Sequence, residues 1–131
     1  MTNENTSRSI LVVEDDDSIR ETLQEILEVE GYRVETAVDG QEALERLRRA
    51  PLPSLILLDL MLPNVNGWQV IEELRVDAQS PEAGVPIVIT SAAGDMAAVT
   101  AKKVEGYLKK PIQLDSLLKV AEKYCGPQVL I

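Results

Sequence analysis

Polar side chains follow four short aliphatic runs in this sequence, at the point where each run ends. In chain order they are Glu14 and Asp15, then Asp59, then Thr90 and Ser91, and finally Lys109 and Lys110. Carboxylates brought together raise each other's pKa unless a cation joins them, and hard oxygen ligands of this kind suit Mg²⁺. A lysine and a hydroxyl opposite the metal can hold the remaining oxygens of a phosphoryl group. A carboxylate in such a site can attack phosphorus, so these residue types together predict an aspartyl phosphate.

Each of these residues also has an ordinary structural interpretation. The acidic run can be a helix cap with solvated neighbours, Ser91 a hydroxyl at a strand end, and Lys110 a surface lysine before a turn. These interpretations do not explain why all four ends carry complementary chemistry. The chemical prediction therefore depends on the elements that would bring the four ends together.

The aliphatic runs have the length of β-strands and are unbroken, which is typical of strands buried on both faces of a parallel sheet. We expect such strands at 10–13, 54–59, 86–91 and 106–109, and a less buried strand with alternating polarity at 32–37. Apolar residues at helical spacing follow each strand. Five strands alternating with five helices predict one doubly wound α/β domain, in which the carboxyl ends of the strands share one edge.

The predicted helices differ in how well the sequence defines them. Gly31 closes the first helix, and Pro51 and Pro53 end the second. The last helix ends before Gly126. The segment 95–104 has only a weak helical pattern, so the fourth helix is expected to be short or irregular.

Composition excludes several classes of function. The chain has 131 residues, 45% of them hydrophobic, which is enough for one domain with a core. We expect that domain at 9–125, after a disordered start at 1–8 and before a tail at 126–131. The net charge of −9 argues against direct DNA binding and against binding to anionic membranes. Because the sequence has no histidine, Ser-His and Cys-His catalysis and histidine metal sites are excluded.

A cytoplasmic location is expected. No apolar stretch approaches the roughly 20 residues that cross a bilayer, and the polar start lacks the apolar core of a signal peptide. The single Cys125 cannot form an internal disulfide, which fits a reducing compartment. We interpret it as a small apolar filler in the last helix.

The chain resembles the receiver domain of bacterial two-component response regulators over nearly its whole length. The matching pieces are 11–15, 59–63 with Gly67, 86–92 and 107–111. The resemblance, to single-domain chemotaxis regulators in particular, implies a flavodoxin-like five-stranded sheet with strand order 2-1-3-4-5. It also implies that a histidine kinase or histidine phosphotransfer protein donates a phosphoryl group to the chain. The chain would then signal through phosphorylation-dependent contacts with an output protein, without being an enzyme for any other substrate.

The resemblance also implies a role for each residue of the phosphorylation site. Asp59 is implied to be both the phosphoacceptor and a ligand of Mg²⁺. Asp15 would bind Mg²⁺ directly and Glu14 mainly through water, with the backbone carbonyl of Met61 as a further ligand. Lys110 matches the lysine of the family, which precedes a cis Lys-Pro bond that directs it inward.

Two further positions correspond to the switch residues of the family. Ser91 takes the place of the switch hydroxyl because it stands directly before Ala92, and Thr90 is the second choice. Tyr107 resembles the aromatic residue that moves between exposed and buried rotamers on activation.

Two features depart from the family pattern. Lys110 follows Ser91 by 19 positions, a few fewer than in similar proteins, so we expect the signalling face that includes the fourth helix to differ. Met61 and Ala93 stand two positions after Asp59 and Ser91, where similar proteins have polar side chains that orient the hydrolytic water. Their apolar side chains predict slow self-dephosphorylation.

Three other functions fit the sequence less well. A phosphatase that uses an aspartyl phosphate needs a second acid two positions after the nucleophile, where this chain has Met61. A flavin- or dinucleotide-binding module needs a glycine-rich or hydroxyl-rich loop after the first strand, whereas the acidic run at 14–17 repels phosphate without a metal. A degenerate receiver that serves only as a phosphorylation-independent docking module would not need the complete set of site residues.

Overall fold

The computed structural model of the chain describes residues 9–92 and 104–126. The elements are β1 (Ser9–Val13), α1 (Asp17–Val29), β2 (Arg33–Ala37), α2 (Gly40–Leu47), β3 (Leu55–Asp59), α3 (Gly67–Arg75), the 3₁₀ helix η2 (Pro81–Gly84), β4 (Ile87–Ser91), β5 (Gly106–Lys109) and α5 (Leu114–Cys125). The strands form one parallel sheet in the order β2-β1-β3-β4-β5, which confirms the predicted fold class. The predicted disordered start at 1–8, the tail beyond Gly126 and nearly all of the predicted fourth helix lie outside the described residues.

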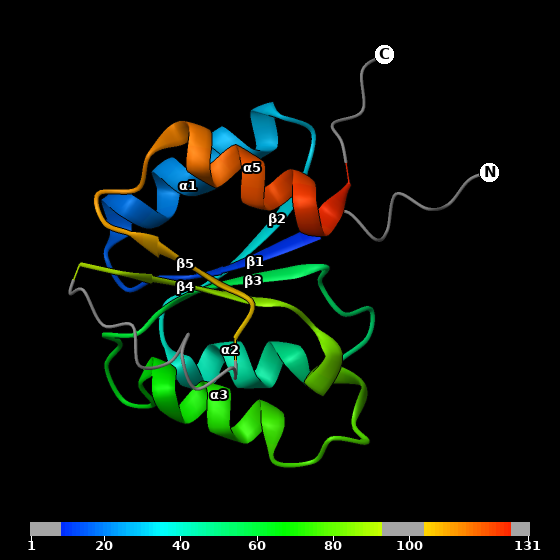
Figure 1. Cartoon of the computed structure of the whole chain (residues 1–131). Helices are drawn as coiled ribbons and strands as arrows, with labels where there is room; N and C mark the ends of the chain where they lie inside the picture. Colours follow the sequence, from blue (N-terminus) through cyan, green and yellow to red (C-terminus); the bar gives the residue numbers. More distant parts are fainter. Residues whose placement is uncertain (1–8, 93–103, 127–131) are drawn as a thin grey trace.

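Helices cover both faces of the sheet, with α1 and α5 on one side and α2 and α3 on the other (Figure 1). Successive side chains of a strand point to opposite faces, so each strand contributes to two separate cores. Residues such as Leu11, Ile56 and Ile89 pack toward α2 and α3. Residues such as Val12, Leu57 and Val88 pack toward α1 and α5. This double burial is why β3 and β4 are built from consecutive aliphatic residues and are buried at every position.

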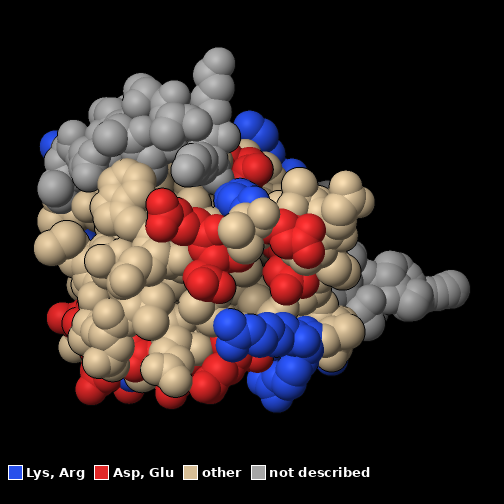
Figure 2. Space-filling model, turned by 90° about the horizontal axis from the view of Figure 1, so that it is seen from below, with Lys and Arg blue, Asp and Glu red and all other residues tan. Residues whose placement is uncertain are grey.

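The edge strand and the helix surfaces are polar, as the alternating pattern of 32–37 predicted. Most residues of β2 are exposed or half-buried. On the side of the molecule formed by α2 and α3, many acidic side chains and several basic ones lie on the surface (Figure 2). None of the helices in the described part of the chain is long and apolar enough to cross a membrane.

The helix ends follow their capping residues. Asp16 caps α1 through a hydrogen bond from the Ile19 N–H, and Gly31 follows this helix with a φ of 98°. The second helix ends at Leu47, well before the prolines that we expected to end it. Arg46 lies in the last turn of this helix. Its guanidinium folds back and donates hydrogen bonds to the carbonyls of Arg49 and Pro51, so it holds the chain that leaves the helix.

Gly67, the first residue of α3, packs directly on the backbone that follows β3. A Cβ at this position would lie 2.6 Å from the carbonyl oxygen of Asp59 and 2.7 Å from the Cα of Leu60. The Gly67 N–H also donates to the Leu60 carbonyl, at 3.1 Å. The absence of a side chain at Gly67 therefore lets α3 approach the end of β3.

Gly67→Ala is therefore expected to destabilise the chain by about 1–3 kcal/mol, because the added methyl group meets backbone atoms that cannot rotate away. Urea unfolding of the two proteins measures this difference. Gly84→Ala is the matched control, since a Cβ at Gly84 has no neighbouring atom within 4 Å. Equal free energies of unfolding for the two variants would contradict the close approach at Gly67.

Candidate functional site

Glu14, Asp59 and Lys110, three of the polar residues predicted to meet, do so at the carboxyl edge of the sheet. The Lys110 Nζ lies 2.7 Å from Glu14 Oε1 and 3.1 Å from Asp59 Oδ2. These three side chains follow β1, end β3 and follow β5, so the parallel topology brings together residues as many as 96 positions apart. The predicted convergence of Glu14, Asp59 and Lys110 is confirmed.

The two carboxylates that contact Lys110 are deeply buried. Glu14 is 2% exposed and Asp59 is 3% exposed. Burial raises the pKa of Glu14, and the charge of Asp59 raises it further, against the lowering effects of hydrogen bonds from Lys110 and from the Asp16 N–H. Burial alone would lower the pKa of Lys110, but its contacts with Glu14 and Asp59 outweigh this and raise it. The lysine is therefore held in its charged form against an excess of negative charge.

A third carboxylate, that of Asp15, completes the acidic cluster. Carboxylate oxygens of Glu14, Asp15 and Asp59 all lie within 4.8 Å of one another. Asp15 is exposed, so the cluster is buried at its base and reached from solvent at its rim. Only oxygen donors are present in this group, and a hard divalent cation such as Mg²⁺ is the metal that such donors fit.

Backbone hydrogen bonds fix the position of Asp59. The Met61 N–H donates to Asp59 Oδ1, at 3.0 Å, while Lys110 takes the other carboxylate oxygen. The Leu60 N–H donates to the Thr90 carbonyl, at 3.3 Å. Met61 is 74% exposed, while its backbone N–H contacts the site residue Asp59.

Both candidate switch hydroxyls lie at the end of β4, beside the acidic cluster. Thr90 pairs with Asp59 across the sheet, and Ser91 pairs with Lys109. Both are buried, at 2% and 1% exposure respectively. The Ser91 carbonyl accepts a hydrogen bond from the Lys110 N–H, at 2.8 Å, so the backbones that carry the hydroxyl and the lysine are directly joined.

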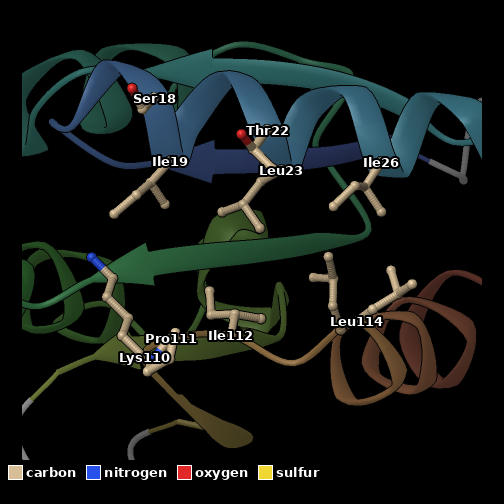
Figure 3. A pocket seen from close by; sticks show the side chains of 10 residues that line it. Ser18, Ile19, Thr22, Leu23, Ile26, Lys110, Pro111, Ile112 and Leu114 are labelled. Atoms are coloured by element: carbon tan, nitrogen blue, oxygen red, sulfur yellow. The ribbon is translucent and has the colours of Figure 1, made fainter.

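An apolar groove of about 310 Å³ lies next to Lys110, between α1 and the segment that enters α5. Figure 3 shows Ile19 and Leu23 of α1 facing Ile112 and Leu114 across it, with Lys110 at one end. The Lys110-Pro111 peptide bond is cis, as the family resemblance predicted. A molecule in this groove would lie beside the lysine that contacts Asp59.

Sequence reasoning missed Arg20, a residue that holds the acidic loop in place. Its Nη1 donates to the Glu14 carbonyl, at 3.0 Å, and its Nη2 contacts Asp17 Oδ1, at 2.6 Å. A basic residue one turn into the helix that follows the acidic run was a usable signal for this contact.

Sequence reasoning also missed the contact between Asp39 and Asn64. The Asn64 Nδ2 donates a hydrogen bond to Asp39 Oδ2, at 3.1 Å. The Pro63-Asn64 dipeptide gave a partial signal, because asparagine tolerates the positive φ of 62° found there. Nothing in the local pattern indicated that Asp39 would be its partner.

Comparison with known protein families gives a match to the model of the response regulator receiver domain, over residues 10–122. The transcriptional regulatory protein AfsQ1 of Streptomyces coelicolor is 38% identical over 108 residues, which cover 80% of this chain and 45% of that protein. The response regulator RR06 of Streptococcus pneumoniae is 35% identical over 114 residues, which cover 85% of this chain and 50% of that protein. The chain thus spans about half the length of the curated relatives it matches.

Solved structures agree with this match. The chemotaxis protein CheY4 of Vibrio cholerae has a TM-score of 0.77 at 28% identity, covering 90% of this chain and 98% of that one. The receiver domain of the sensor histidine kinase PA1611 from Pseudomonas aeruginosa was solved with magnesium in its active-site cleft. It has a TM-score of 0.80 at 28% identity, covering 92% of this chain and 98% of that one. With its fold and most of its length in agreement, this chain belongs to the response regulator receiver domain family.

Proposed function

We propose that the chain is a phosphoacceptor that takes a phosphoryl group onto Asp59 from a phosphohistidine of a histidine kinase or phosphotransfer protein. The observation that carries this proposal is the position of Lys110, whose ammonium lies within hydrogen-bonding distance of both Glu14 and Asp59. An ammonium placed there can hold an oxygen of a phosphoryl group on Asp59. The relatives named as response regulators, with their similar sequences, support the same function.

In the proposed reaction, an oxygen of the Asp59 carboxylate attacks phosphorus and the P–N bond of the donor breaks. The electron pair of that bond leaves with the histidine nitrogen, and Asp59 becomes an acyl phosphate. Mg²⁺, held by Asp15 and Asp59, by Glu14 through water and by the Met61 carbonyl, would supply charge neutralisation on the phosphoryl oxygens. The Met61 N–H holds the carboxylate in place during the attack, and Lys110 balances the charge that develops on the transferred group.

The signalling step is proposed to run through Ser91 and Tyr107. Side chains alternate along a strand, so Ser91 projects to the same face of β4 as Ile89, the core residue that pairs with Tyr107. Tyr107 is half-buried and packs against the same core. A phosphoryl group on Asp59 that draws Ser91 toward it would shift the populations of the conformers around Tyr107 and change affinity for an output partner.

Incubation with a small phosphodonor and Mg²⁺ tests the proposal. We expect the intact mass to rise by one phosphoryl group, and we expect no increase after the metal is chelated. A chain that stays unmodified with metal and donor present would contradict the proposal, and would favour a docking module that works without phosphorylation.

Mg²⁺ itself is expected to stabilise the folded chain, by about 2.7 kcal/mol when its concentration is a hundred times its Kd. Urea unfolding with and without Mg²⁺ measures this gain. Asp15→Asn should reduce the gain, whereas Glu25→Gln, an exposed carboxylate on α1, should leave it unchanged. The gain should also shrink as the pH falls, because the raised pKa of Glu14 lets protons compete with the metal. If Mg²⁺ raised the free energy of unfolding equally in Asp15→Asn and Glu25→Gln, the assigned metal cluster would be contradicted.

Self-dephosphorylation is expected to be slow, because the apolar side chain of Met61 cannot orient a water by a strong hydrogen bond. Ala93, the other position behind this expectation, lies outside the described residues. Met61→Asn should release phosphate faster than the parent, in a time course followed after the donor is removed. A half-life of only seconds for the parent chain would contradict the expectation.

A further inference from the structure

The turn between β2 and α2, residues 37–40, touches both loops that form the acidic cluster. On one side, the Ala37 carbonyl accepts a hydrogen bond from the Glu14 N–H, at 3.0 Å. On the other side, Asp39 Oδ2 accepts a hydrogen bond from Asn64 Nδ2, at 3.1 Å. This turn therefore connects the loop that carries Glu14 to the loop at 60–66 that carries Met61.

The contact with the second loop is also one of close backbone packing. Gly40 is buried, and a Cβ added to it would lie 1.9 Å from the Val65 carbonyl oxygen. No side chain fits between the backbone of Gly40 and that of Val65. The start of α2 therefore packs directly against the loop at 60–66 and limits its position. Asn64 lies beside this contact with a φ of 62°, a conformation that few residues adopt.

The turn is well suited to this task because its own geometry is fixed. Asp39 caps α2, with its Oδ1 accepting from the Glu42 N–H at 2.9 Å, and Glu42 Oε1 accepts from the Val38 N–H at 3.0 Å. These two hydrogen bonds hold the backbone on both sides of the N-cap residue of α2. One carboxylate oxygen of Asp39 thus orders the helix while the other holds Asn64.

We propose that residues 37–40 form a brace that sets the position of the loop at 60–66, and with it the Met61 backbone on which Asp59 and the metal depend. Asp39 and Gly40 are positioning residues in this account, since neither reaches the acidic cluster itself. The expected effect of the brace on Mg²⁺ binding and labelling rests on the proposed function. The contacts that form the brace are present in the chain without metal or phosphate. Loss of the brace should loosen the Met61 N–H from Asp59 and weaken Mg²⁺ binding.

A swap of the two side chains tests the brace. Asn64→Asp places two carboxylates against each other, while asparagine and aspartate both tolerate the positive φ. Asp39→Asn combined with Asn64→Asp restores a donor and an acceptor in opposite order and keeps a good helix cap. The amide at position 39 in that double variant donates to the carboxylate at position 64.

Three measurements are made on the full chain: hydrogen exchange of the 60–66 amides without metal, the Kd for Mg²⁺, and the rate of labelling by the small phosphodonor. In Asn64→Asp we expect faster exchange at Met61 and at least about threefold weaker Mg²⁺ binding, with both restored in the double variant. An added carboxylate alone would tighten Mg²⁺ binding, so weaker binding reports the position of the loop. Gly40→Ala should give larger effects of the same kind, if that variant folds.

The outcomes separate the brace from the proposed function. Unchanged exchange and unchanged or tighter Mg²⁺ binding in Asn64→Asp would overturn the brace, as would a failure of the double variant to restore them. A merely structural role would lower the free energy of unfolding in Asn64→Asp without a change at Met61, and would also overturn it. If the parent chain is not labelled at all, the proposed function fails, while exchange at Met61 still decides whether the brace exists.

Discussion

Asp59→Asn is expected to abolish labelling by a phosphodonor in the presence of Mg²⁺, while the chain stays folded. The amide has nearly the shape of the carboxylate and can still accept the hydrogen bond from the Met61 N–H. It lacks the charge and the nucleophilic oxygen that attack on phosphorus requires. The variant also relieves the repulsion that raises the pKa of Glu14. Intact-mass measurement after incubation reads the outcome as the presence or absence of one added phosphoryl group.

The comparison needs a control with the same chemical change elsewhere. Asp77→Asn alters an exposed aspartate in the loop after α3 and should be labelled like the parent. Labelling that survives Asp59→Asn would mean that another carboxylate, such as Glu14 or Asp15, accepts the phosphoryl group. Loss of labelling in both variants would point to a general effect on folding, which urea unfolding would show.

Lys110→Ala is expected to slow labelling by a factor of about 10²–10³, because it removes a donor aimed at the transferred group. It should also destabilise the metal-free chain by about 3 kcal/mol, since Glu14 and Asp59 would stay buried without the ammonium that contacts them both. Mg²⁺ should then stabilise this variant more than it stabilises the parent. Labelling rates and urea unfolding with and without Mg²⁺ measure these three effects.

Lys109→Ala is the matched control, because Lys109 is the neighbouring residue and is exposed. It should leave both the labelling rate and the Mg²⁺ effect close to those of the parent. Equal labelling rates in the two lysine variants would contradict the role assigned to Lys110, whatever their stabilities.

The sheet and the centre of the site could be predicted from the sequence because both follow from local patterns. The aliphatic run before Asp59 predicts a strand buried on both faces, and β3 is such a strand. Parallel pairing then places the ends of β1, β3 and β5 at one edge, so Glu14 and Lys110 meet although 96 positions separate them. The carboxylates and the lysine at those strand ends were enough to identify Glu14, Asp59 and Lys110 as candidate site residues.

The parts that could not be predicted depend on contacts between residues that look ordinary in their own segments. Asp39 reads as a turn residue, and only the packing of α2 against the loop at 60–66 makes it the partner of Asn64. Arg46 looks like an ordinary basic residue near the end of a helix, and only the path of the chain beyond α2 makes the carbonyls of Arg49 and Pro51 its partners. Such choices are decided by tertiary packing, which local propensity does not encode.

The assignments of Ser91 over Thr90 and of Tyr107 as switch residues remain predictions. Both hydroxyls are buried at the end of β4, and the geometry there agrees with either choice. The order of side chains along the strand supports Ser91, because that residue projects to the face on which Tyr107 packs.

The most direct measurement for the central claim is the identity of the residue that carries the phosphoryl group. Hydroxylamine converts an acyl phosphate into a hydroxamate at the same carboxyl carbon and releases phosphate, whereas it leaves a phosphate ester of serine or threonine intact. Trypsin places the candidates in three different peptides, 9–20 with Glu14 and Asp15, 50–75 with Asp59, and 76–102 with Thr90 and Ser91. We predict a hydroxamate at Asp59 in peptide 50–75. A hydroxamate in peptide 9–20, or a phosphate that resists hydroxylamine in peptide 76–102, would contradict the account.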